Sequence, residues 1–113
     1  MTDTIIFHMC RADEWREAQK TGIYPGSSQD QADGFIHFST AEQLGETLAM
    51  HFSGVEDLLL LTVDEDGLDV KWEAARTGDL FPHLYGILPL SAVLAINPLL
   101  LSDEGRHILP SQL

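Results

Sequence analysis

The chain has 113 residues, of which 44% are hydrophobic, and eighteen acidic against six basic residues give a formal net charge of −12. Such a chain forms one globular domain, so we expect a single domain over residues 1–113. The charge argues against nucleic acid as a partner, which requires a basic surface, and no apolar run is long enough to cross a membrane. One cysteine, Cys10, and the lack of a signal-peptide pattern predict a cytoplasmic protein.

The first half of the chain alternates apolar runs with amphipathic or turn-rich segments. Its predicted elements, in order, are a buried strand at residues 4–10, a helix at 11–21, a turn-rich loop at 24–33, a strand at 35–38 and a helix at 41–52. Trp15 and Ala18 lie three apart on one face of the first helix, and Gly22 marks its end. Ser39 and Thr40 are candidate caps of the second helix.

The second half is richer in strands. Its predicted elements are strands at residues 57–63 and 70–75, a segment at 81–86, a helical turn at 89–92 and a strand at 93–96. The first of these strands is almost continuously apolar, which indicates a central position in a sheet. Pro82 predicts that the 81–86 segment is a loop or an edge strand. Strands and helices do not alternate regularly, so the fold class expected is α+β.

Three of the five histidines, His8, His37 and His83, lie in short apolar segments rich in aromatic residues. An imidazole in apolar surroundings needs partners for its ring nitrogens. We therefore expect the three rings to meet, either as a polar network in the core or as a ligand site. Their spacing, and that of Cys10, matches no zinc motif, so no metal site is expected.

Strand alternation places His37 and Ser39 on one face, at the point where a helix begins. A hydroxyl group at a helix N-terminus can help to bind an anion. The alternative is that Ser39 or Thr40 only caps the helix, while His37 bonds a backbone carbonyl group.

The later strands carry three further candidate residues. Glu73 has apolar neighbours and could act as an acid, a base or an acceptor for ribose hydroxyl groups; alternatively it is solvated and pairs with Lys71 or Arg76. His83 and Tyr85 lie two apart and project to the same side of an extended chain, where they could orient a sugar or stack on a base. The alternative is that this segment only closes the core.

The strings Gly-Phe-Ile-His-Phe-Ser at residues 34–39 and Phe-Pro-His-Leu-Tyr-Gly at residues 81–86, with the pair Trp72-Glu73, resemble a bacterial family of domains of unknown function, numbered 952. The resemblance covers Ile5 to about Ile96. That family is grouped by fold with the ADP-ribosyltransferase-like proteins. It therefore implies small split antiparallel sheets with two main helices, and a cleft that binds a nucleotide or ADP-ribose-like ligand.

The resemblance also implies roles for residues. His8 matches a first-strand position that binds ribose hydroxyl groups, Ser39 would orient the second ribose, and Glu73 would stabilise an oxocarbenium-like centre. The residues assigned in this way are His8 and Glu73 as catalytic, and His37, Ser39, Thr40, His83 and Tyr85 as ligand-binding. NAD is then a substrate for ADP-ribosyl transfer or glycohydrolysis, with no cofactor. The alternative is a non-catalytic module that binds a small molecule or a protein and has a structural histidine network.

Overall fold

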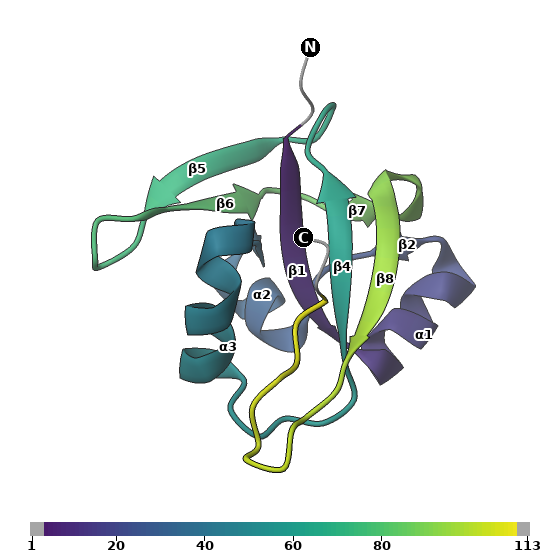
Figure 1. The fold of residues 1–113 in the computed structure, drawn as a ribbon. Helices are drawn as coiled ribbons and strands as arrows, with labels where there is room; N and C mark the ends of the chain where they lie inside the picture. Colours follow the sequence, from purple (N-terminus) through teal and green to yellow (C-terminus); the bar gives the residue numbers. More distant parts are fainter. Residues whose placement is uncertain (1–3, 111–113) are drawn as a thin grey trace.

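The computed structural model describes residues 4–110, which form two three-stranded antiparallel sheets, a two-stranded sheet and short helices (Figure 1). The first sheet has the order β1-β4-β8, from β1 (Ile5–Arg11), β4 (Leu58–Asp64) and β8 (Val93–Leu99). The second has the order β3-β6-β5, from β3 (Ile36–His37), β6 (Leu80–Leu84) and β5 (Val70–Ala74). The third joins β2 (Ile23–Tyr24) to β7 (Leu88–Pro89). The helices are α1 (Ala12–Thr21), α2 (Ser28–Asp33) and α3 (Leu44–His51), with 3-10 turns η1 (Ala41–Gln43) and η2 (Leu90–Ala92).

This arrangement confirms the expected α+β class with small antiparallel sheets. Within residues 4–110, no helix combines the length and the hydrophobicity that crossing a bilayer requires.

Strands β1 and β4 of the first sheet are buried on both faces, and α1 and α3 lie on opposite sides of this sheet (Figure 1). Ile6 and Leu61 face a core cluster that includes Trp15 of α1. Phe7 faces the other cluster, which includes Leu44 of α3. Because both faces exclude water, these strands are almost continuously apolar instead of alternating. The expected central position of residues 57–63 is confirmed, since β4 lies between β1 and β8.

Two predicted helices form close to their expected bounds. Gly22 follows α1 with a φ of 86°, a left-handed conformation that glycine adopts without steric cost. The second predicted helix begins with η1 and continues as α3. Its N-cap is Thr40, whose backbone N–H donates to Gln43 Oε1 at 2.9 Å.

The prediction of a loop over residues 24–33 is wrong, because this segment contains α2. Ser27 Oγ accepts from the Asp30 N–H at 3.1 Å, and Asp30 Oδ2 accepts from the Ser27 N–H at 2.8 Å. This reciprocal cap satisfies two of the N–H groups that begin a helix. A six-residue polar helix held by its cap has no apolar stripe, so periodicity did not reveal it.

The prediction that the 81–86 segment is a loop or an edge is also wrong, because β6 is the central strand of the second sheet. Pro82 is tolerated there because its neighbour β3 is very short. The Pro82 carbonyl group accepts from the Phe38 N–H at 3.0 Å, so the proline nitrogen also points to the β3 side. It lies there beyond the last register pair of β3 with β6, His37 with His83, and its missing N–H interrupts no pair within β3.

The second sheet turns its two faces to different surroundings. Ile36 and Leu84 are buried and pack into the first core cluster. His37 and His83 alternate with them and are opposite each other in register, so both project from the other face. We call this other surface the outer face of the second sheet, and it carries most of the residues singled out in the sequence.

Candidate functional site

Two of the three histidines meet on the outer face of the second sheet. His37 of β3 and His83 of β6 are register partners, and their ring centroids are 5.5 Å apart. Lys71 of β5 is the next residue in the same cross-strand row, since it pairs with His83. Three neighbouring strands therefore place two imidazoles and an ammonium group side by side.

Glu73 binds two polar residues of this face, His83 and Tyr85. Its Oε1 accepts from His83 Nδ1 at 2.8 Å and from the Tyr85 hydroxyl group at 2.6 Å. The bond from Tyr85, and then that from His83, lowers the pKa of Glu73, while the bond to Glu73 raises the pKa of Tyr85. A carboxylate can only accept, so the Nδ1 of His83 carries a proton. In neutral His83 the Nε2 is then a free acceptor, and it has no hydrogen-bond partner among residues 4–110.

Phe35 holds the His83 ring in place. The two rings stack with centroids 4.1 Å apart and an angle of 24° between their planes. Phe35 also contacts His37 and Tyr85, at centroid distances of 4.7 and 5.3 Å. Lys71 Nζ lies 4.9 Å from the centre of the Tyr85 ring, which is a cation–π contact. The outer face is thus an aromatic surface with a fixed imidazole in it.

Asp30 is a buried carboxylate that ties α2 to β3. It is only 3% exposed, and its Oδ1 accepts from both Nδ1 and the backbone N–H of His37, at 2.6 and 3.2 Å. The Oδ2 of Asp33 lies 3.1 Å from the other ring nitrogen of His37. Both nitrogens of His37 therefore face carboxylates, which favours the doubly protonated imidazolium.

The charges in this cluster shift one another's pKa. The hydrogen bond to Asp30 raises the pKa of His37 against the opposing effect of burial. Burial alone would raise the pKa of Asp30, but the hydrogen bond from His37, the nearby His8 and backbone N–H groups lower it overall. We infer an ion pair between His37 and Asp30 at neutral pH.

His8 lies behind this face, in the core. It is 4% exposed, its Nδ1 donates to the backbone carbonyl group of His37 at 2.6 Å, and its Nε2 accepts from the Tyr24 hydroxyl group at 2.8 Å. Asp30 Oδ2 is 3.7 Å from Nε2. Burial lowers the pKa of His8, so the ring is neutral. The His8 ring reaches no surface that a ligand could occupy.

The raised pKa of His37 and the lowered pKa of His8 predict a maximum in the stability of the fold near pH 6.5, the ordinary histidine pKa. The contribution of His37 is complete below about pH 6.5 and is lost as the pH rises through its raised folded-state pKa. The contribution of His8 is complete above about pH 6.5 and is lost as the pH falls through its lowered folded-state pKa. Urea unfolding from pH 5 to 8 measures both slopes.

Two substitutions test which histidine causes the loss of stability on each side of pH 6.5. We expect His37→Gln to flatten the decline above pH 6.5 and His8→Gln to flatten the decline below it. Unchanged slopes in both variants would contradict the assignment, because other groups would then control the profile.

The family of the chain follows from comparison with other proteins. A family model described as "Protein of unknown function (DUF952)" matches residues 9–96. The chain belongs to this family. The match contains Glu73, His83 and Tyr85 and begins one residue after His8. No curated protein matches the chain.

Solved structures of a Caulobacter crescentus protein share the fold of this DUF952 chain. The crystal structure of protein CC0527 is 44% identical, with a TM-score of 0.89, and the alignment covers 94% of this chain and 95% of that one. The solution structure of CC0527 is 43% identical, with a TM-score of 0.81 and coverage of 90% of each chain.

Two of the residues predicted for the site lie elsewhere in this DUF952 domain. After His37 the chain leaves the second sheet, and Ser39 pairs with Phe7 of β1. Ser39 is 2% exposed and its hydroxyl group donates to Thr47 at 3.4 Å, so it does not stand beside His37 as strand alternation suggested. Thr40 lines an open groove of about 860 Å³ together with Phe7 and Trp72. Since Trp72 and Glu73 alternate along β5, this groove and the histidines lie on opposite faces of the second sheet.

The structure therefore brings together His37, Glu73, His83 and Tyr85, with His8 bound behind them. The cluster also contains four residues that the sequence patterns did not predict for it: Asp30, Asp33, Tyr24 and Phe35. The spacing of Ser27 and Asp30 was an available signal, because it is that of a helix cap. Within residues 4–110, no three His, Cys, Asp or Glu side chains group as metal ligands would.

Proposed function

We propose that the outer face of the second sheet binds a nucleotide or ADP-ribose-like ligand, such as NAD, through its ring and the adjoining ribose. The observation that carries this proposal is the Glu73–His83 pair. Glu73 holds the Nδ1–H of His83, and Nε2 has no partner among the residues that the structure describes. This is the arrangement in which a carboxylate fixes the tautomer of a general base.

The pair supports glycohydrolase or ADP-ribosyl-transfer chemistry. His83 Nε2 takes the proton of a water molecule, or of an acceptor hydroxyl group, while that oxygen bonds to C1′ of the ribose. The C1′–N bond breaks, its electron pair stays on the ring nitrogen, and neutral nicotinamide leaves. His83 then releases the proton to solvent. Glu73 stabilises the imidazolium that forms during the step.

The other residues support the reacting pair. Phe35 and Tyr85 offer aromatic surfaces on which a ring can stack. His8 acts as a positioning residue, because its bond to the His37 carbonyl group fixes the end of β3. The ADP-ribosyltransferase-like grouping of the fold is part of this proposal and rests on the resemblance of the sequence. Ser39 and Thr40 take structural roles in it, since their contacts lie away from His83.

Ligand binding tests the proposal through the melting temperature. With NAD or ADP-ribose at about ten times its Kd, the free energy of unfolding rises by about 1.4 kcal/mol. We therefore expect the melting temperature to rise by roughly 5 °C. The rise should disappear in His83→Gln and persist in His51→Gln, a matched change at an exposed histidine that ends α3. No rise with either ligand at millimolar concentration would remove the proposal.

The second candidate function is a non-catalytic binding module with a structural histidine network. It is favoured by one observation: both ring nitrogens of His8, and both of His37, are engaged by protein groups. The contacts of His8 and His37 therefore indicate a structural role for two of the three histidines. The two candidates differ in the role of His83, which only the enzyme needs for turnover.

A further inference from the structure

The charges around His83 limit the kind of ligand that the site can take. We infer that the outer face of the second sheet selects a nucleoside with a cationic or uncharged ring, free of phosphate, over the corresponding dinucleotide. Nicotinamide riboside represents this class. The inference rests on the proposed function, because it names which part of a NAD-like ligand the protein itself holds.

Carboxylates outnumber cations that can bind a ligand at this site. Asp33 and Glu73 have side chains that are 38% and 41% exposed. Oε1 of Glu73 accepts both protein bonds, and its second oxygen has no hydrogen bond within the described part of the chain. That oxygen is an acceptor for a ribose hydroxyl group and attracts a positive ring.

The cations present are already engaged. His37 directs one ring nitrogen to Asp30 and the other to Asp33, which leaves no donor for a phosphate oxygen. Lys71 lies over the ring of Tyr85 and shares the outer face with Glu73, two positions along β5, so its positive charge is partly offset by that carboxylate. Binding a phosphate group normally takes an arginine fork, a free lysine or exposed N–H groups at a helix start.

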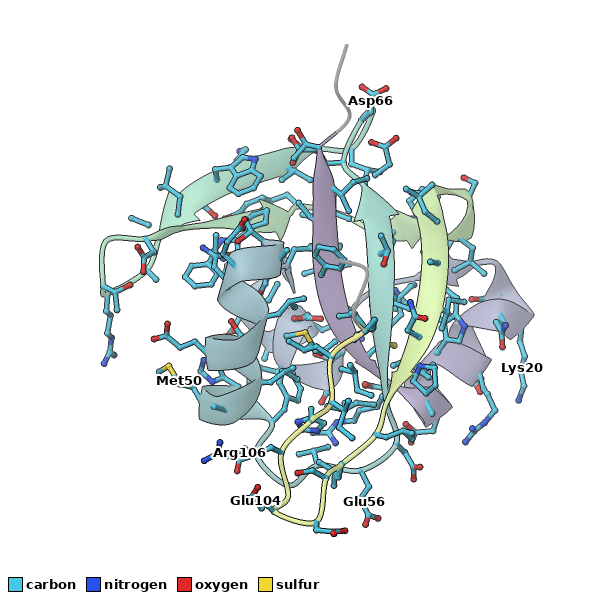
Figure 2. The ribbon with its side chains drawn as sticks, in the orientation of Figure 1. Lys20, Met50, Glu56, Asp66, Glu104 and Arg106 are labelled. Carbon is cyan, nitrogen blue, oxygen red and sulfur yellow. The ribbon has the colours of Figure 1, made fainter. Side chains whose placement is uncertain are left out.

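Of the other basic residues, Arg76 lies in the turn of the β5–β6 hairpin, and Arg11, Arg16, Lys20 and Arg106 lie outside this hairpin. Within residues 4–110, no arginine forms an ion pair with a carboxylate of this site. Figure 2 shows Lys20 at the end of α1 and Arg106 in the segment after β8, both away from the β5–β6 hairpin. The first N–H groups of α2 are capped by Ser27 and Asp30, so this helix offers no anion site either. A net charge of −12 adds a long-range repulsion of anions.

The same face suits a positive ring. Phe35, His83 and Tyr85 form adjoining aromatic surfaces, and an aromatic face attracts a cation. Carboxylates beside such a surface increase that attraction and also accept from the two hydroxyl groups of a ribose. A nicotinamide riboside therefore matches the face at both its ring and its sugar, while a diphosphate meets negative charge.

Calorimetric titration of three ligands tests this inference. Nicotinamide riboside, nicotinamide mononucleotide and NAD differ in the number of phosphate groups and share the reacting end. We expect the affinity to fall with each phosphate group, by about tenfold from the riboside to NAD at low salt, and the difference to shrink at 0.5 M salt, where charges are screened. Asp33→Asn should also reduce the difference in affinity between the riboside and NAD. Asp66→Asn, in the turn between β4 and β5, is the matched control and should leave it unchanged (Figure 2).

The outcomes separate this inference from the proposed function. If NAD binds as tightly as the riboside or more tightly, and His83→Gln abolishes that binding, the inference is overturned and the proposed function stands. If none of the three ligands binds, the proposed function fails and the inference fails with it. A preference for the riboside that Asp33→Asn does not alter would also overturn the inference, because charge would not be its cause.

Discussion

Replacing Asp30 by alanine is expected to lower the free energy of unfolding by about 3 kcal/mol, a large part of the total for a domain of this size. The carboxylate is buried and accepts from the Ser27 N–H, the His37 N–H and the His37 ring. Its removal leaves these donors unsatisfied and leaves the imidazolium without its buried partner. It also removes half of the cap that starts α2.

Urea unfolding at pH 6.5 measures this loss, and Asp33→Ala is the matched control. Asp33 also faces the His37 ring, but its side chain is 38% exposed. An ion pair at that exposure contributes less than about 1 kcal/mol. Equal losses in the two variants would contradict the central role of Asp30, because burial would then make no difference.

The second large effect is expected on turnover. If His83 is the base, His83→Gln should reduce kcat for nicotinamide release by about 10²–10⁴-fold, the usual contribution of general-base catalysis. Glutamine has nearly the size of histidine and can still donate to Glu73, so the fold should be kept. Since His83 Nε2 has no protein partner among the described residues, its loss strands no buried group.

Two further variants locate the effect. Glu73→Gln should also lower kcat, because an amide cannot stabilise the imidazolium that forms on His83. Tyr85→Phe removes one of the two bonds to Glu73 and should have a smaller effect. His51→Gln is the control for a histidine away from the site. A wild-type protein that binds NAD without releasing nicotinamide, or a His83→Gln variant with full turnover, would favour the non-catalytic module.

Much of the fold could be predicted from local patterns, and the errors have identifiable causes. The long apolar runs gave β1 and β4 because burial on both faces leaves little room for polar residues. The helix α2 was missed because a cap, and not an apolar stripe, holds its six residues. Pro82 misled the prediction for β6, because the length of the neighbouring strand β3 decides whether a missing N–H matters.

The candidate site was predicted in part. Glu73 was singled out by itself, and His83 and Tyr85 were singled out as a pair on one side of an extended chain; the structure joins all three through one carboxylate oxygen. The partner of His37 could not be found in this way. Asp30 lies in a segment that looked like a loop, and it reaches His37 only because α2 packs against β3.

The sequence by itself determined that the chain is a small, acidic α+β protein. It also determined that the three histidines in apolar segments would need partners. Both conclusions follow from composition and from hydrophobic periodicity, which depend only on neighbours along the chain. Only the tertiary structure decided which histidine is buried and which meets the surface. The register between β3 and β6 sets His37 against His83 on the outer face, while β1 presents His8 to the core behind them. Such pairing is fixed by contacts between distant segments, and no local pattern contains it.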